Sequence, residues 1–231
     1  MKTPASASSS PSKSPSTKSR VLIVDDHELL REGLRLLIDR EPDLEVCGDA
    51  ADEPAGIRKV SQLSPEIVIV DLSLSSGSGL ELIKWIHKNS PDTKIIVSSM
   101  HDESLYGERV LRAGANGYVN KQDPARTILR AIREVRNGKL YFSDELTQRM
   151  VSQFRVDRAS PAESPIHLLS DRELEVFRLI GQGLTTGQIA TQLHRSPSTV
   201  STYRDRIKTK LGLTNGAELT YRAIHWTDQS D

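Results

Sequence analysis

The sequence predicts a doubly wound α/β domain with a five-stranded parallel sheet, followed by a small all-α domain that contains a helix-turn-helix. Three observations predict this class. Short apolar runs alternate with longer amphipathic segments from residue 20 to residue 138. The pattern becomes wholly helical after residue 167. Between these parts, the stretch "RASPAESPIH" has the composition of a flexible linker. Alternating strands and helices favour a parallel sheet with helices on both faces.

Five apolar runs are predicted to form the strands, because continuous apolar character is typical of parallel strands that are buried on both faces. They lie at 21–24, 44–48, 66–71, 94–99 and 117–120. The first intervening helix is expected to place Leu29 and Ile38 on the same inner side. The last helix is expected to begin with Asp123 as its N-cap and Pro124 in its first turn, and to end at Gly138.

The rest of the chain divides into three further segments. Residues 1–19 are rich in serine, proline and lysine without an apolar core, which predicts a disordered tail and not a secretory signal. The first domain is expected at 20–138, and 139–167 is expected to be a linker with one helix over "SDELTQRMVSQF". The second domain is expected at 168–231, where Ser170 and Ser196 are the predicted caps of two helices.

Charge and cysteine content restrict the possible partners and the compartment. Residues 20–150 hold 18 basic against 22 acidic side chains, whereas residues 166–226 hold 8 against 5. This imbalance favours nucleic acid as the partner of the second domain. A single cysteine, Cys47, excludes an internal disulfide framework and indicates a reducing compartment, so we expect a cytoplasmic protein. No apolar run is long enough to predict a membrane span.

Acidic residues follow two of the predicted strands. Asp25 and Asp26 end the first strand, and Asp71 ends the third. In a doubly wound sheet these strands are neighbours near the point where the strand order reverses, so the three carboxylates should converge in one crevice. Adjacent carboxylates repel one another unless a cation lies between them. Oxygen ligands of this kind suit Mg²⁺, which we expect as the cofactor.

Two more polar groups are predicted at the same edge of the sheet. Ser99 ends the fourth strand with a hydroxyl, and Lys121 follows the fifth with an ammonium. Carboxylates, a divalent cation, a hydroxyl and a lysine together form a set that is suited to the transfer of a phosphoryl group.

Several motifs resemble a known family. "VLIVDDH", "IVIVDLSLSSGSGLELI", "KIIVSSMHDE" and "GANGYVNKQ" resemble the flavodoxin-like receiver domain of bacterial two-component response regulators. "LSDRELEVFRLIGQGLTTGQIATQLHRSPSTVSTYRDRIKTKLG" resembles the LuxR-type helix-turn-helix. Together the motifs cover about four fifths of the chain, in the order that is typical of the NarL/FixJ class. The resemblance implies a receiver that controls a DNA-binding domain.

The resemblance also implies the roles of the acidic residues. Asp71 would accept a phosphoryl group from the phosphohistidine of a sensor histidine kinase. Asp25 and Asp26 would hold Mg²⁺ together with Asp71 and the backbone carbonyl of Ser73. The cation and a lysine would neutralise the negative charge that develops as the carboxylate attacks.

Further residues take their expected roles from the same resemblance. Ser99 would bond a phosphoryl oxygen, Lys121 would pair with it, and Tyr118 would be the aromatic side chain that reorients. Ser75 departs from the family, which usually has proline at this position. The loop "SLSSGSG" is therefore expected to be less rigid than in the family.

The predicted helix at 197–211 would be the one that lies in the major groove. The resemblance places Ser201, Thr202 and Asp205 towards base edges, and Thr199, Arg204, Lys208 and Lys210 near phosphates. Val200, Ile207 and Leu211 are expected in the domain core. The family often has lysine at the positions of Ser201 and Asp205, so its sequence preference does not transfer. Asp205 could instead form a surface ion pair with Lys208.

The favoured function is a phosphorylation-controlled, DNA-binding transcriptional regulator that dimerises on phosphorylation and has no enzymatic activity beyond assisting its own phosphorylation and dephosphorylation. One alternative is an aspartyl-phosphate hydrolase of the haloacid dehalogenase type. Such hydrolases resemble D-x-D, whereas "DLS" carries no second carboxylate. Another alternative is an adaptor whose helical domain does not bind DNA.

Overall fold

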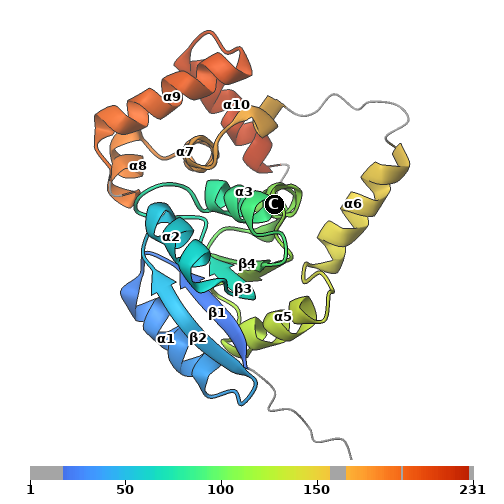
Figure 1. The fold of residues 1–231 in the computed structure, drawn as a ribbon. Coiled ribbons are helices and arrows are strands. Elements are labelled where there is room, and N and C mark those ends of the chain that lie inside the picture. The colour runs from blue at the N-terminus through green and yellow to red at the C-terminus, as the bar shows by residue number, and fades with distance from the viewer. Residues whose placement is uncertain (1–17, 157–164, 194, 229–231) are drawn as a thin grey trace, which may run out of the picture.

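The computed structural model describes residues 18–156, 165–193 and 195–228. Most of the predicted tail, at 1–17, and the middle of the predicted linker, at 157–164, lie outside the described residues. The first strand begins at Ser19, which is one residue inside the predicted tail. The described chain forms a sheet with helices on both faces, and a group of helices lies beyond one edge of this layered domain (Figure 1).

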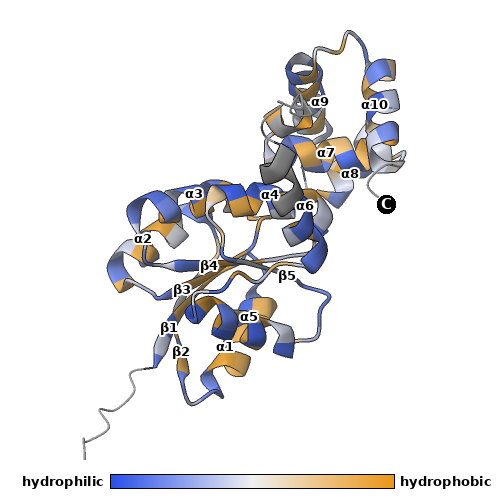
Figure 2. Cartoon of the chain, turned by 90° about the vertical axis from the view of Figure 1, so that its right-hand side faces the viewer, coloured by the Kyte–Doolittle hydropathy of each residue, from blue (hydrophilic) through white to orange (hydrophobic). Residues whose placement is uncertain are grey.

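The sheet has five parallel strands in the order β2-β1-β3-β4-β5, which confirms the predicted doubly wound class. The strands are β1 (Ser19–Val24), β2 (Leu44–Ala50), β3 (Ile67–Val70), β4 (Lys94–Ser99) and β5 (Gly117–Asn120). Two helices cover one face, and they are α1 (Glu28–Asp39) and α5 (Arg126–Arg136). Three helices cover the other face (Figure 2), and they are α2 (Glu53–Leu63), α3 (Gly79–Asn89) and α4 (Glu103–Ala113).

The core consists of apolar side chains on both faces of the sheet. In β1, Val21 and Ile23 belong to the cluster under α1 and α5, and Leu22 and Val24 belong to the cluster under α2, α3 and α4. All four side chains are buried. Burying such an aliphatic side chain contributes about 1.5–3 kcal/mol relative to leaving it exposed. The strand is therefore held from both sides, and the residue that follows it is fixed at the sheet edge.

Helix α6 (Asp144–Val156) packs against α4. The remaining helices form a separate group, and they are the 3₁₀ turn η1 (Pro165–Leu168), α7 (Asp171–Gly181), α8 (Thr186–Gln192), α9 (Pro197–Leu211) and α10 (Gly216–Asp228). The stretch in which the sequence predicts one helix is occupied by α6. The capping box of α7 is present, because Ser170 and Glu173 each accept a bond from the other's backbone N–H. Within the described residues, no helix combines the length and apolarity that crossing a bilayer requires.

Two predicted details of the helices are wrong. Leu29 is 87% exposed, because its separation of nine positions from Ile38 amounts to about two and a half helical turns, which places the two side chains on opposite sides. The last helix of the sheet domain begins at Arg126 with Ala125 at the N-cap. The carboxylate of Asp123 instead accepts a hydrogen bond from the N–H of Asn120 at 3.2 Å, which closes the turn before the helix.

Candidate functional site

Three carboxylates meet at the carboxyl ends of β1 and β3. The two strands pair directly, with Val24 opposite Val70, so Asp25 and Asp71 follow at the same edge of the sheet. The N–H of Asp71 continues the ladder to the carbonyl of Val24 at 2.8 Å. Both aspartates are 2% exposed. Carboxylate oxygens of Asp25, Asp26 and Asp71 lie within 4.8 Å of one another, as the sequence predicts for this crevice.

A fourth potential ligand in this cluster is His27, which the sequence reasoning missed. One of its ring nitrogens belongs to the same 4.8 Å cluster. Its backbone N–H donates to Asp25 Oδ1 at 2.8 Å, and its Nδ1 lies 2.8 Å from Asp26 Oδ1. The two atoms are close enough for an ion pair, but they do not form a hydrogen bond. Asp26 Oδ1 is buried without a hydrogen-bond partner among the described residues. The adjacency of histidine to two aspartates in "DDH" is the signal that could have revealed it.

Lys121 provides the positive charge of the site. Its Nζ lies 2.6 Å from Asp71 Oδ2 and 2.7 Å from Asp25 Oδ2. Burial alone would lower the pKa of Lys121, but the two carboxylates outweigh burial and raise it, so the ammonium stays charged. Burial raises the pKa of Asp71 to about 6, and Lys121 only partly opposes this effect. The carboxylate of Asp71 is therefore held at some cost in desolvation.

His101, which the sequence did not indicate, is a shared hydrogen-bond partner of Ser73, Ser99 and Tyr118. The Oγ of Ser99 is buried and accepts from the N–H of His101 at 3.2 Å, and the carbonyl of His101 accepts from the Tyr118 hydroxyl at 2.8 Å. The N–H of Ser73 donates to Asp71 Oδ1 at 3.2 Å, and its Oγ lies 2.8 Å from His101 Nε2. Burial lowers the pKa of His101 and raises that of Tyr118, so both side chains are neutral.

These residues fit a hard divalent cation. Three carboxylates supply the oxygen ligands that Mg²⁺ prefers, and the buried Asp26 Oδ1 has no hydrogen-bond partner among the described residues. Asp25, Asp26 and Asp71 would hold the ion, which supplies positive charge opposite the negative charge of a phosphoryl group. Lys121 offers an ammonium to Asp71, and Ser99 offers a buried hydroxyl at the end of β4.

The predicted recognition helix is α9, and its core residues Val200, Ile207 and Leu211 are buried as expected. The predicted groove-facing side chains of Ser201, Thr202 and Asp205 are exposed, and so is Lys210, whereas those of Thr199, Arg204 and Lys208 are half-buried. Two of the predicted contacts have intramolecular partners. Lys208 Nζ lies 2.9 Å from the carboxylate of Asp205, and Lys210 Nζ lies 2.6 Å from that of Glu173.

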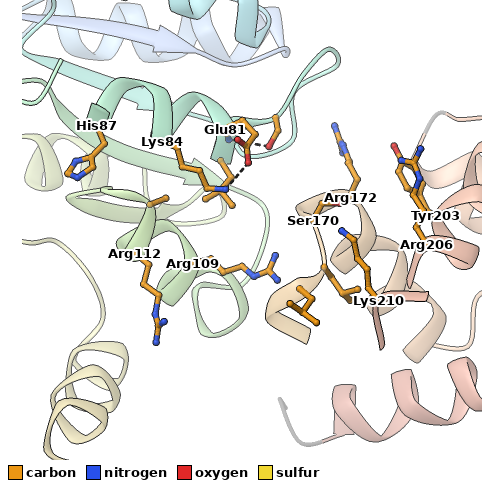
Figure 3. Close-up of a pocket in the computed structure, with 15 residues that line it drawn as sticks. Glu81, Lys84, His87, Arg109, Arg112, Ser170, Arg172, Tyr203, Arg206 and Lys210 are labelled. Carbon is orange, nitrogen blue, oxygen red and sulfur yellow. Dashed lines mark hydrogen bonds and ion pairs between the residues drawn. The ribbon is translucent and has the colours of Figure 1, made fainter. Parts of the chain in front are cut away.

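A cleft of about 870 Å³ separates α3 and α4 from α7 and α9 (Figure 3). Cationic side chains from both walls line it, and they are Lys84, Arg109, Arg112, Arg172, Arg206 and Lys210. Tyr203, Arg206 and Lys210 belong to α9, so one side of the recognition helix faces the sheet domain. This side of α9 therefore faces the receiver across the cleft, with Arg206 and Lys210 exposed to solvent.

Three arginine side chains donate hydrogen bonds to backbone carbonyls between the sheet domain and the helical domain. Arg172 Nη2 donates to the carbonyl of Leu74 at 2.5 Å, and Arg195 Nη2 donates to that of Ser75 at 3.0 Å. From the opposite side, Arg109 Nη2 donates to the carbonyl of Ile166 at 2.8 Å. No pattern in the sequence indicates these bonds, because they depend on how the two domains are placed.

Comparison with known proteins gives the class of the chain. Residues 21–133 match the response regulator receiver domain, and residues 167–223 match the bacterial regulatory proteins of the luxR family. The chain belongs to the response regulators that join a receiver domain to a LuxR-type helix-turn-helix domain.

Individual relatives cover almost the whole chain. The oxygen regulatory protein NreC of Staphylococcus epidermidis is 36% identical over 210 residues, which is 89% of this chain and 96% of the relative. The response regulator UvrY of Escherichia coli K12 is 35% identical over 205 residues, which is 88% of this chain and 93% of the relative. The structure of RcsB from Salmonella enterica serovar Typhimurium, bound to promoter rprA with the phosphomimetic BeF₃⁻, has a TM-score of 0.56 at 27% identity, covering 89% of this chain and 98% of that one.

Proposed function

We propose that this response regulator accepts a phosphoryl group on Asp71 from a sensor histidine kinase and thereby controls DNA binding by its helical domain. The observation that carries the proposal is the position of Asp71. It is buried at the carboxyl end of β3, beside Asp25 and Asp26, with the ammonium of Lys121 2.6 Å from its Oδ2. This is the set of groups that a carboxylate needs to react with a phosphorylated donor.

The residues of the site take separate parts in the reaction. Asp71 supplies the attacking carboxylate oxygen, and Asp25 and Asp26 hold the divalent cation with it. Lys121 neutralises the transferred group, and Ser99 donates a hydrogen bond to one of its oxygens. The buried position of Ser99, next to His101 in the loop after β4, supports this role. The protein needs no further enzymatic activity than this assistance to its own phosphorylation and dephosphorylation.

The new phosphoryl dianion changes the charge of the site and shifts a two-state element. It draws in Ser99 and Lys121 and so weakens the bonds from Lys121 to Asp25. Tyr118, which is held by the carbonyl of His101, is the aromatic side chain that then reorients. Because the loops after β3 and β4 contact α7, this rearrangement releases the helical domain from the receiver.

Double-stranded DNA is the proposed partner of α9. Solved structures of RcsB are described as bound to promoter DNA, and one as two dimers bound to two parallel DNAs. By analogy, the phosphorylated chain pairs with a second copy and binds DNA through α9, with Thr199, Arg204, Lys208 and Lys210 near phosphates. A regulator that binds the chromosome and takes its phosphoryl group from a kinase acts in the cytoplasm.

The test uses acetyl phosphate as a small donor, with Mg²⁺ or with EDTA. A hydroxylamine-labile phosphate adduct is expected only with Mg²⁺, and it is expected to disappear in Asp71→Asn, which keeps the shape of the side chain. Asp92→Asn changes an exposed aspartate and serves as the matched control. An adduct of the same lability in the Asp71→Asn variant would show that another residue is the acceptor. Continuous release of phosphate from many monoesters would instead favour the hydrolase.

A further inference from the structure

The loop that follows the acceptor is unusually rich in small residues. It reads "SLSSGSG" over residues 73–79, with Gly77 in the left-handed region at a φ of 85°. Ser75 stands where the resembling family usually has proline. Serine and glycine leave the free chain many conformations, so ordering this loop costs more conformational entropy than ordering a proline-containing one. Contacts from elsewhere must therefore hold it.

Two of those contacts come from the DNA-binding domain. Arg172 binds the carbonyl of Leu74 and Arg195 binds that of Ser75, so two consecutive carbonyls of the loop are held. The guanidinium of Arg172 is itself oriented, because its Nη1 lies 2.8 Å from the carboxylate of Glu175 one turn later in α7. A planar guanidinium that is fixed in this way directs its remaining N–H groups at a set point.

A third contact holds the residue before these two. The Oγ of Ser73 bonds the Nε2 of His101 at 2.8 Å, and the same Nε2 lies 3.9 Å from Glu175. Three successive residues of the loop are thus held, by His101, Arg172 and Arg195 in turn. The first of them matters for the acceptor, since the N–H of Ser73 donates to Asp71 Oδ1. Fixing the loop therefore fixes one oxygen of the acceptor carboxylate.

We infer that the DNA-binding domain completes the phosphoryl-acceptor site, with Arg172 and Arg195 as positioning residues that hold the loop after Asp71 in place of the missing proline. This inference rests on the proposed function, because it concerns the same acceptor and cation. The two arginines hold the carbonyls of Leu74 and Ser75, the residues that follow Ser73. Ser73 is thereby kept next to Asp71, where its backbone can serve the cation. The docked DNA-binding domain thus assists the cation site, although docking turns one side of its recognition helix towards the receiver.

A reciprocal effect follows. If docking of the helical domain raises the affinity of the receiver for Mg²⁺, then Mg²⁺ must favour docking by the same factor. Loss of either arginine should weaken Mg²⁺ binding without removing any ligand. Coupling between two such sites typically amounts to ~5-fold or more in affinity.

The experiment compares full-length Arg172→Gln and Arg195→Gln with the wild type. Amide hydrogen exchange of peptides from residues 72–78 is expected to become faster in both variants, even in EDTA. Isothermal titration with Mg²⁺ is expected to show ~5-fold weaker binding in each variant and a larger loss in the double variant. Arg222→Gln removes an exposed arginine of α10 and should match the wild type in both measurements.

Ser75→Pro provides a rescue that a merely structural role of the arginines would not give. The φ of Ser75 is not positive, and its N–H bonds none of the residues that the structure describes, so proline at this position removes no hydrogen bond. Added to Arg172→Gln, it is expected to return the loop exchange and the Mg²⁺ affinity towards wild-type values. This rescue is expected because proline removes conformations from the free loop.

The outcomes separate this inference from the proposed function. Unchanged exchange and unchanged Mg²⁺ affinity in both arginine variants would overturn the inference. Tighter Mg²⁺ binding by the variants would also overturn it, because the arginines would then restrain the loop away from the binding geometry. A wild type that binds no Mg²⁺, or an Asp71→Asn variant that binds it equally well, would contradict the proposed function instead.

Discussion

The ammonium of Lys121 lies 2.6 Å from the carboxylate of Asp71, although the two residues are 50 positions apart in the chain. The side chain of Lys121 is 6% exposed and that of Asp71 is 2% exposed. Charges buried to this degree lose most of their hydration, which direct pairing only partly restores. The stability of the receiver should therefore respond strongly to changes at either residue.

Asp71→Asn should stabilise the metal-free protein at neutral pH. The pKa of Asp71 is about 6 in the folded chain, against an ordinary value of 3.8, so the folded state favours the protonated form. The contribution of this carboxyl group to the free energy of unfolding is fully present below about pH 4. It is lost as the pH rises to about 6, which lowers the free energy of unfolding by up to about 3 kcal/mol. Urea unfolding in EDTA at pH 4.5 and pH 7.5 should show that the variant gains clearly more stability over the wild type at the higher pH.

The control for this prediction is Asp92→Asn, whose carboxylate is exposed. Its difference from the wild type should be the same at both pH values. An Asp71→Asn variant that is less stable than the wild type at pH 7.5 would mean that the bond from Lys121 outweighs desolvation.

Lys121→Gln should destabilise the metal-free protein by about 3–5 kcal/mol, because Asp25 and Asp71 then face each other without a buried cation. Mg²⁺ should recover more stability in this variant than in the wild type, since the ion supplies the missing positive charge. Thermal unfolding over a Mg²⁺ titration measures both effects. Equal stabilisation of the two proteins by Mg²⁺ would place the ion away from Lys121.

Gly79→Ala should disturb the backbone at Asp71 directly. A Cβ on Gly79, the first residue of α3, would lie 2.1 Å from the carbonyl oxygen of Asp71 and 2.6 Å from Leu72 Cα. Relieving such a clash requires backbone movement, which typically costs about 1–3 kcal/mol. Gly33→Ala is the matched control, because a Cβ in this position of α1 meets nothing within 4 Å. It should stabilise the helix by up to about 1 kcal/mol.

The sequence predicted those parts of the structure that strand order and periodicity determine. Asp25, Asp71 and Lys121 meet because each follows a parallel strand, and parallel strands end at one edge. The sequence predicted less well in which direction individual side chains point. Leu29 was misplaced because a leucine-rich helix offers several sides with apolar residues.

The contacts between the domains could not be predicted at all. The bond from Arg172 to Leu74 joins residues 98 positions apart in two separate units, and each residue is ordinary in its own unit. His101 was missed for a related reason. Its bonds to Ser73 and Tyr118 depend on the path of the loop after β4, which no local pattern determines.

Residues 160–231 in isolation should bind DNA at least as well as the unphosphorylated full-length chain. In the full chain, Tyr203, Arg206 and Lys210 of α9 line the cleft that faces the receiver, and removing the receiver opens this side of the helix to DNA. Gel retardation of genomic fragments with both proteins, at equal salt, compares the affinities. Weaker binding by the fragment would argue that the receiver assists, for example through dimerisation. An absence of binding by both would favour the adaptor.

Asp205→Ala tests the orientation of α9 on DNA. The Asp205 side chain is 72% exposed and pairs with Lys208, so it is free to exchange this partner for a cytosine amino group. If it contacts a base, the variant should bind its preferred site more weakly by about 1–3 kcal/mol and relax its choice at one base pair. Selection from a random DNA library gives both values. Tighter binding to all sequences, strongest at low salt, would instead place Asp205 beside phosphates.

The arginines that join the two domains all bind main-chain oxygens, those of Leu74, Ser75 and Ile166. Every residue type has such an oxygen, so substitutions in the accepting segments leave the acceptors intact as long as the backbone path is kept. For these bonds to persist in a lineage, the only side chains that must be conserved are those of the arginines. Recombination that joins this DNA-binding domain to another receiver with the same loop path would preserve two of the three bonds without any adaptation of the new receiver's side chains.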